Sequence, residues 1–165
     1  EAGADVIDHG IYLNDALAER MVRQGTYYSP TLSAYCCQTM HPRFQRGEEW
    51  ARSHRVLVEP HREAIRAAVR AGVKVVTGTD STGVYAEEVQ LMREGEMKSM
   101  DSILACTRYA AEALGMADRI GTVVDGKLAD LVVLDGDPLA DPWALERVHV
   151  LVKDGRVYRP EEIVL

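Results

Sequence analysis

The chain has 165 residues, of which 47% are hydrophobic and 27% are charged, and its formal net charge is −7 at pH 7. This length suffices for one domain with a real core, or for one domain with a small appendage. The acidic charge argues against binding to nucleic-acid phosphates or anionic lipid, and the sequence contains no apolar run of the roughly 20 residues that cross a bilayer. We therefore expect neither a nucleic-acid partner nor a membrane partner.

The first part of the chain alternates short strands with helices. The expected elements are, in order, a strand over 4–8 that ends at His9, a helix over 14–23, a strand over 26–28, a loop-rich stretch with some helix over 33–53, a helix over 54–71, a strand over 73–77, and helices over 84–94 and 99–114. Repeated strand–helix units favour a parallel sheet with crossover helices. The fold class predicted for this part is α/β.

After Gly115 the pattern changes to short β-branched runs separated by Gly, Asp and Pro. Strands are predicted over 120–123, 129–134 and 148–152, and Asp154-Gly155 is the dipeptide favoured in a tight hairpin turn. We therefore divide the chain into residues 1–118, which carry the β/α units, and residues 119–165, which form a small β-segment.

The cysteines indicate a reducing compartment. Cys36 and Cys37 are adjacent and Cys106 stands alone, so the count is odd and the spacing does not suit a disulfide framework. The N-terminus lacks the pattern of a signal peptide. Together these features predict a cytoplasmic protein.

Two residues stand where β/α folds gather their chemistry, at the carboxyl ends of strands. His9 ends the first strand, and Asp80 follows the strand over 73–77. Imidazole and carboxylate are common ligands of Zn²⁺ and similar ions. From pattern alone, however, a single His after a strand is more often structural, and Asp80 could equally cap the following helix. His61, seven residues after His54, is expected on a solvated helix face.

Several segments in order resemble the amidohydrolase superfamily, in the branch of imidazolonepropionase-like enzymes and of prolidase-like or arginine-carboxypeptidase-like hydrolases. They are ADVIDHG (4–10), PTL (30–32), AGVKVVTGTDS (71–81), AAEALG (110–115), IGT (120–122), GKLADLVVLDGDPL (126–139) and VKDGR (152–156). The resemblance covers essentially the whole chain. It implies the C-terminal portion of a (β/α)₈ TIM-type barrel, about strands six to eight with their helices, followed by a β-segment of the flanking β-sandwich domain.

The resemblance also implies roles for individual residues. His9 matches the metal-binding histidine at the end of the sixth strand, and Asp80 matches the aspartate of the eighth strand, which binds metal and transfers the proton. Tyr28, Ser29 and Thr31 lie where the loop after the seventh strand would touch substrate. The implied reaction is hydrolysis of an amide, peptide or cyclic amide C–N bond by water activated on a divalent metal, with Zn²⁺ as the expected ion, and one or two ions in the complete enzyme.

Other family ligands have no counterpart here: the His-x-His pair of the first strand, the bridging carboxylated Lys and the fifth-strand His. The loop after Asp80 also lacks the His-Gly of many relatives. We therefore expect a portion of a longer hydrolase, inactive alone, that needs a complementary N-terminal barrel portion or self-association and acts on a small-molecule or peptide-like substrate. The alternatives are a non-catalytic binding or assembly module and a related metal-dependent deaminase.

Overall fold

The computed structural model describes residues 3–36, 48–80 and 83–162. Its first part is built on parallel extended segments. Strand β1 (Val6–Asp8) pairs in parallel with β2 (Tyr27–Ser29), and on the other side of β2 an isolated parallel bridge joins Tyr28 to Val75. The carboxyl ends of all three segments therefore meet at one edge, as expected for β/α units.

The third segment is shorter as a strand than the sequence predicts. Two hydrogen bonds hold it to β2: the Tyr28 amide donates to the Lys74 carbonyl at 3.0 Å, and the Val76 amide donates to the Tyr28 carbonyl at 2.8 Å. The next amide, that of Thr77, donates to the carbonyl of Ala105 in a helix at 3.3 Å. The ladder predicted over 73–77 is thus limited to the bridge because its far side faces a helix.

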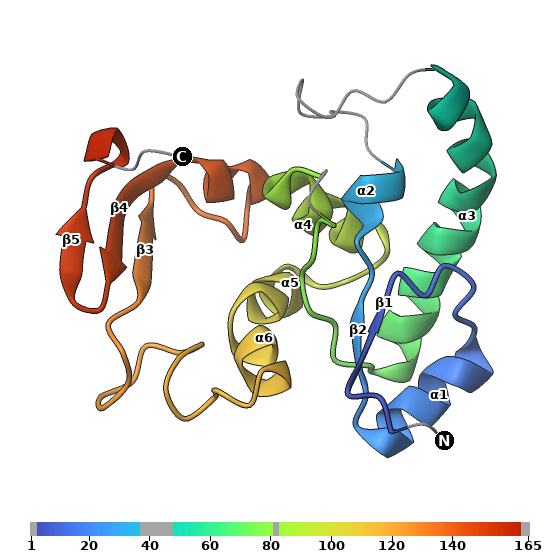
Figure 1. Cartoon of the computed structure of the whole chain (residues 1–165), viewed down its shortest axis with the longest axis horizontal. Helices are drawn as coiled ribbons and strands as arrows, with labels where there is room; N and C mark the ends of the chain where they lie inside the picture. Colours follow the sequence, from blue (N-terminus) through green and yellow to red (C-terminus); the bar gives the residue numbers. More distant parts are fainter. Residues whose placement is uncertain (1–2, 37–47, 81–82, 163–165) are drawn as a thin grey trace.

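Helices cover these segments (Figure 1). They are α1 (Asp15–Gln24), α2 (Leu32–Cys36), α3 (Glu48–Ala71), α4 (Tyr85–Glu94), α5 (Ser99–Cys106) and α6 (Arg108–Ala113). The side chain of Asn14 caps α1 as predicted, by accepting a hydrogen bond from the Leu17 amide at 3.0 Å. Helix α3 begins six residues earlier than the predicted 54–71, inside the stretch that was expected to be loop-rich.

The single helix predicted over 99–114 is two helices, α5 and α6. The break lies at Thr107, whose backbone has φ −131° and ψ −88°. The hydroxyl of Thr107 donates to the Ile103 carbonyl at 2.7 Å. Such local bonding by a β-branched residue competes with the regular helical ladder, which periodicity alone cannot reveal.

The main core lies between the parallel segments and the helices α3 and α4. Its largest fully buried apolar side chains include Tyr28, Leu32, Ile65, Val89 and Met92. They come from β2, α2, α3 and α4, so one cluster ties the strand ends to the helices that follow them. This packing is what positions the loops at the strand ends.

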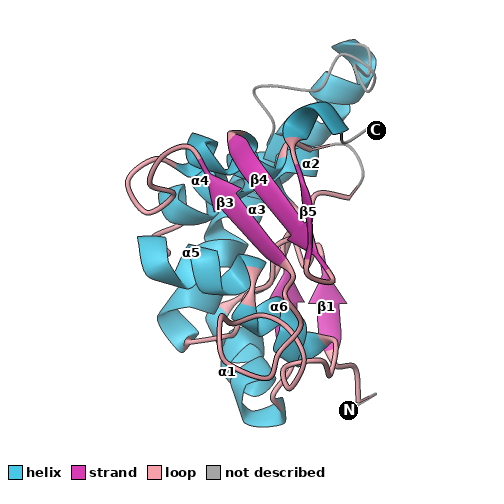
Figure 2. Ribbon diagram, turned by 90° about the vertical axis from the view of Figure 1, so that its left-hand side faces the viewer, coloured by secondary structure: helices cyan, strands magenta, loops and turns pink. Residues whose placement is uncertain are grey.

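The C-terminal part forms a second sheet, separate from the first (Figure 2). Its antiparallel strands lie in the order β3 (Leu131–Leu134), β4 (Val148–Lys153), β5 (Arg156–Tyr158), with the 3₁₀ turns η2 (Pro142–Glu146) and η3 (Pro160–Glu162). The predicted hairpin turn is confirmed: Asp154 and Gly155 have φ 51° and 76°. The division at residue 118 stays a prediction.

The strand predicted over 120–123 is not formed. Instead, the ammonium group of Lys127 is wrapped by this segment, and donates to the Ala117 and Ile120 carbonyls at 2.6 and 3.2 Å and to the Thr122 hydroxyl at 2.6 Å. Carbonyls that accept from the Lys127 ammonium group point towards it and not towards a neighbouring strand, so they do not form a β-ladder.

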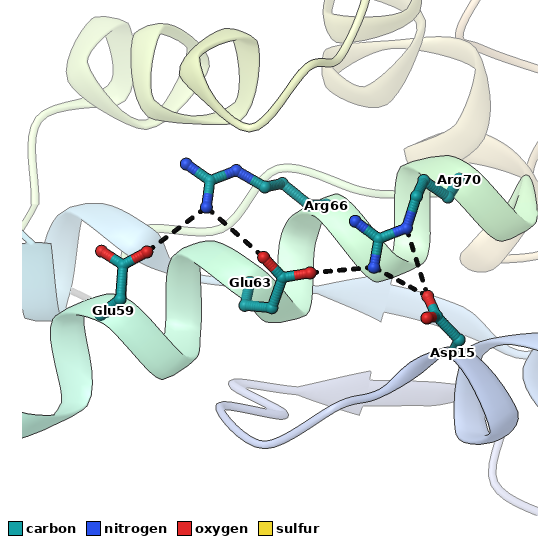
Figure 3. Close-up of polar contacts among 5 residues, drawn as sticks. All are labelled: Asp15, Glu59, Glu63, Arg66 and Arg70. Carbon is teal, nitrogen blue, oxygen red and sulfur yellow. Dashed lines mark hydrogen bonds and ion pairs between the residues drawn. The ribbon is translucent and has the colours of Figure 1, made fainter.

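An exposed chain of ion pairs runs along α3 and reaches α1 (Figure 3). Arg66 contacts Glu59 and Glu63, both at 3.4 Å, and Arg70 contacts Glu63 at 2.9 Å and Asp15 at 2.8 Å. Because these side chains are largely solvated, the network fixes orientation more than it adds stability. Among the described residues, no helix combines the length and apolar character that a bilayer crossing needs.

Candidate functional site

Three residues other than glycine have left-handed backbones within four residues of the ends of the three parallel segments. They are His9 (φ 64°), Thr31 (φ 56°) and Asp80 (φ 47°). For a β-branched residue such as Thr31 this conformation is a true outlier, and strained residues of this kind gather at functional sites. The strain therefore marks the same edge at which the sequence predicts His9 and Asp80 to act.

The imidazole of His9 is oriented by the hydroxyl of Thr31. The Thr31 hydroxyl donates its proton to the Pro30 carbonyl at 2.6 Å, and His9 Nδ1 lies 2.6 Å from the same hydroxyl oxygen. When the hydroxyl donates to Pro30 it accepts from His9, and this network assigns the hydrogen of the neutral ring to Nδ1. This tautomer leaves Nε2 with a free lone pair, which is the form of histidine that binds a metal.

The main chain of His9 is held as firmly as its ring. Its amide donates to the Ser29 carbonyl at 2.9 Å, and its carbonyl accepts from the hydroxyl of the fully buried Tyr28, also at 2.9 Å. A Cβ on Gly10 would lie 2.8 Å from the Tyr28 ring, so only glycine lets this ring approach. Strand β2 therefore holds both the amide and the carbonyl of His9.

Asp80 is exposed and follows the third parallel segment, 74–76, which pairs with β2. It does not cap α4: the N-cap is Val84, and the Ala86 amide of the first turn donates instead to Glu146 at 3.1 Å. No hydrogen bond joins the Asp80 carboxylate to another described residue, so its oxygens are available to a ligand. Ser81 and Thr82 lie outside the described residues.

Glu88 is a fully buried carboxylate that the sequence reading missed. From α4 it reaches the turn after β2, where its oxygens accept from the Leu32 amide at 3.0 Å and from the Ser33 amide at 2.6 Å. Burial raises the pKa of Glu88 to about 7, against the lowering effect of these donors. Its spacing of three and four to the buried Leu91 and Met92 was the available signal.

His61 was expected on a solvated face and is instead fully buried. Among the described residues neither ring nitrogen has a hydrogen-bond partner, and the ring stands edge-on to Tyr35, 5.4 Å between centroids, while Tyr35 stands edge-on to His9 at 5.6 Å. Burial lowers the pKa of His61 to about 4, a shift that the nearby carbonyls of Pro30 and His9 oppose. The missed signal is its helical spacing to Ile65, four residues on.

Substrate contact by Tyr28, Ser29 and Thr31 stays a prediction. Tyr28, Ser29 and Thr31 are all nearly inaccessible, at 0%, 7% and 4% exposure, so in this structure they support the site rather than line open space. Within the described part of the chain, no group of three or more His, Cys, Asp or Glu side chains could hold a metal. The metal-ligand roles of His9 and Asp80 stay predictions, and a metal held by these two residues would need further donors.

Residues 1–158 match the model of the amidohydrolase family. The chain belongs to the amidohydrolase family. The resemblance inferred from the motifs is therefore confirmed.

Individual relatives of this amidohydrolase chain agree with that assignment. It is 30% identical to an ochratoxinase of Aspergillus niger over 86% of the chain, and 32% identical to an imidazolonepropionase of Hyphomonas neptunium over 61% of the chain. Among solved structures it resembles a Xaa-Pro dipeptidase with methionine bound in the active site (TM-score 0.80, 32% identity, 96% of this chain), and the A. niger ochratoxinase (TM-score 0.81, 26% identity, 99% of this chain).

The matched part of each relative is limited. The chain spans 30% and 27% of the two curated relatives, and 40% and 38% of the two solved structures. The α/β fold is therefore shared with amidohydrolase structures over this part.

Proposed function

We propose that this chain carries the His9 and Asp80 portion of a metal-dependent hydrolase that cleaves an amide, peptide or cyclic amide C–N bond. The observation that carries the proposal is the strained edge where His9 and Asp80 follow two parallel segments that flank β2. Membership of the amidohydrolase family supports the reaction class. The segments β1, β2 and 74–76 would correspond to strands six, seven and eight of a TIM-type barrel.

The donors fit a divalent ion such as Zn²⁺. The hydrogen bond from His9 Nδ1 to Thr31 leaves Nε2 as a ligand, and the exposed Asp80 carboxylate supplies oxygen, which are the donor types that Zn²⁺ accepts. Four-coordinate zinc needs further donors, so these two residues would hold the ion only together with ligands from elsewhere.

In the reaction, a bound divalent ion would supply Lewis acidity and lower the pKa of a water molecule towards about 7. Asp80 takes the proton from the attacking water and delivers it to the leaving nitrogen, so the C–N bond breaks without releasing an amide anion. His9 contributes by orientation: its ring is fixed through Thr31 and its main chain through Tyr28.

The missing donors require a partner on the free side of β1. Within the described residues β1 pairs with β2 alone, and an apolar groove of about 550 Å³ runs beside it, lined by residues such as Ile7, Leu13 and Met21. The groove suits a further strand beside β1 and a helix packed on it. The solved relatives contain further polypeptide, since this chain spans about 40% of them. We propose that complementary amidohydrolase polypeptide covers this groove; a second copy of the chain is the other possible occupant.

Zinc titration of the 165-residue chain combined with the N-terminal part of an amidohydrolase relative, followed by calorimetry and elemental analysis, tests the ligand roles. Both His9→Ala and Asp80→Asn are expected to weaken zinc binding at least tenfold. His149→Ala is the matched control, because His149 is exposed and its Nδ1 lies 3.2 Å from an Asp135 carboxylate oxygen. Unchanged zinc affinity in both site variants would reject the proposed ligands.

Activity needs the groove to be filled. We expect dipeptide hydrolysis when the chain is combined with the N-terminal part of an amidohydrolase relative, and loss of at least 99% of that activity in Asp80→Asn. Native mass spectrometry identifies the occupant: a one-to-one complex supports complementary polypeptide, and a homodimer with its own zinc-dependent turnover would support self-association instead. A folded Asp80→Asn complex with normal turnover would remove Asp80 from the mechanism.

A further inference from the structure

We infer that Glu88 is a positioning residue that, through the backbone of Leu32 and Ser33, holds Thr31 in the conformation which fixes the tautomer of His9. Its importance for metal binding rests on the function proposed above. Its effect on His9 can be measured without metal or substrate. The inference is built on a short path of contacts from α4 to the end of β1.

The first step of the path is the pair of hydrogen bonds at the start of α2. Glu88 Oε1 accepts from the Leu32 amide at 3.0 Å, and Oε2 accepts from the Ser33 amide at 2.6 Å. These are the two residues that follow Thr31. With both carboxylate oxygens engaged, the peptide groups after Thr31 are fixed relative to α4.

The second step is the strain at Thr31. A threonine at φ 56° persists only where its surroundings leave no other choice. The Thr31 carbonyl accepts from the Ala34 amide at 3.2 Å, which closes the turn, and Glu88 holds the two amides inside that turn. The residue itself is 4% exposed, so solvent cannot take the place of these contacts.

The third step carries the constraint to His9. In this conformation the Thr31 hydroxyl oxygen lies 2.6 Å from both the Pro30 carbonyl oxygen and His9 Nδ1. If Thr31 relaxes to an ordinary backbone conformation, the hydroxyl leaves, and Nδ1 loses the acceptor that keeps its proton there. The ring then distributes its proton between both nitrogens, which withdraws the Nε2 lone pair for part of the time.

A glutamine at position 88 interrupts this path with little change of shape. Its amide offers one acceptor oxygen and one NH₂ group, so one of the two backbone amides would face a donor. Glu88→Asp is a second variant, which keeps the charge and shortens the side chain so that it cannot reach both amides. Either variant tests the path if the other fails to fold.

The experiment is a proton–nitrogen correlation spectrum of the histidine rings in the metal-free full chain, under mildly alkaline conditions where imidazoles are neutral. In the unaltered chain we expect His9 to be essentially all Nδ1–H. In Glu88→Gln or Glu88→Asp we expect a mixture with at least a third Nε2–H. A His9 ring that is not Nδ1–H in the unaltered chain, or one that stays Nδ1–H in both variants, would overturn the inference.

Two controls separate positioning from general loss of stability. Val89→Ala removes a fully buried side chain from the same helix without touching the turn, and Glu94→Gln makes the same chemical change at an exposed position. Both should leave His9 as Nδ1–H; a shift in Val89→Ala as large as in Glu88→Gln would reduce Glu88 to a structural role and overturn the inference. Because no metal or substrate enters, failure of zinc binding in the unaltered chain combined with the N-terminal part of a relative would contradict the proposed function alone.

Discussion

At the scale of single residues, the pKa values of two buried groups beside the strand ends are shifted in opposite directions. The pKa of Glu88 is raised to about 7 and that of His61 is lowered to about 4, in both cases chiefly by burial. Each shift favours the neutral form in the folded chain. Their contributions to the pH dependence of unfolding therefore have opposite signs over an overlapping range, and tend to cancel.

For Glu88, stability falls as the pH rises. The folded chain binds this proton more tightly than the unfolded chain, whose carboxyl titrates near 4.5, so stabilisation is complete below 4.5 and is lost on the way up to about 7. At about 1.4 kcal/mol per pKa unit, the loss amounts to roughly 3 kcal/mol. In Glu88→Gln we expect the slope to change to a rise with pH over this range. Urea unfolding at a series of pH values measures it, and an unchanged slope would contradict a neutral buried Glu88.

For His61, stability falls as the pH drops. The unfolded chain takes up this proton near pH 6.5 and the folded chain only near 4, so stabilisation is complete above 6.5 and is lost between these values. His61→Leu, which keeps a side chain of similar size in the buried position, should remove roughly 3 kcal/mol of acid sensitivity. The same urea series tests it, and a variant as acid-sensitive as the unaltered chain would show that His61 does not titrate in this way.

The residues that the sequence could identify are those attached to recognisable strand ends. His9 and Asp80 follow β-branched runs and stand beside glycines, so pattern and resemblance together pointed to them. Glu88 and His61 come from the middle of helices, where burial depends on which face meets the core. Tertiary packing decides that face, and a charged or polar residue there reads as solvated from composition alone.

At the scale of elements, helices were predicted better than strands. Asn14 and Gly25 mark the ends of α1 because capping is a local interaction. The strand predicted over 73–77 was too long, because strand pairing depends on neighbours that are distant in sequence. The helix over 99–114 was not divided, since the turn of the Thr107 side chain towards Ile103 leaves apolar periodicity intact.

Gly83, just ahead of α4, packs directly on Ser33 of α2, and this contact predicts a severe effect of a larger residue at position 83. A Cβ there would lie 2.0 Å from Ser33 Oγ and 2.6 Å from Ser33 Cβ. Gly83→Ala should therefore lower the free energy of unfolding by about 1–3 kcal/mol, as overpacking does. Thermal and urea unfolding measure the change. In a Ser33→Gly background, where both atoms are absent, the same substitution should cost less than half as much; equal costs would place the strain elsewhere.

At the scale of the whole molecule, Arg93 of α4 links the helices around the parallel segments to the residues between β3 and η2. Arg93, near the end of α4, donates to the Pro138 carbonyl at 2.6 Å and to the Leu139 carbonyl at 3.2 Å, both ahead of η2, and to the Ser102 hydroxyl of α5 at 2.9 Å. The β3–β5 sheet lies at the far end of the molecule from α3 (Figure 1), and α4 packs on the η2 turn between β3 and β4.

Arg93→Ala should therefore loosen the C-terminal sheet more than the parallel segments. Losing three hydrogen bonds from a charged donor, with two carbonyls left unpartnered, should cost about 2–3 kcal/mol. Arg93→Lys should recover less than half of that, because an ammonium group cannot engage both carbonyls and the hydroxyl as the planar guanidinium does. Hydrogen exchange resolved by residue distinguishes the two parts of the molecule.

The expected pattern is faster exchange at the amides of β3 and β4, with little change at the Tyr28 amide of β2. Arg23→Ala serves as the control, since Arg23 is exposed and lies 3.8 Å from Glu19 on its own helix; it should change neither region. Equal acceleration in both regions by Arg93→Ala would mean that the molecule unfolds as one unit. In that case, residues 119–165 would not form a separately stable part, and the predicted division of the chain would have no energetic counterpart.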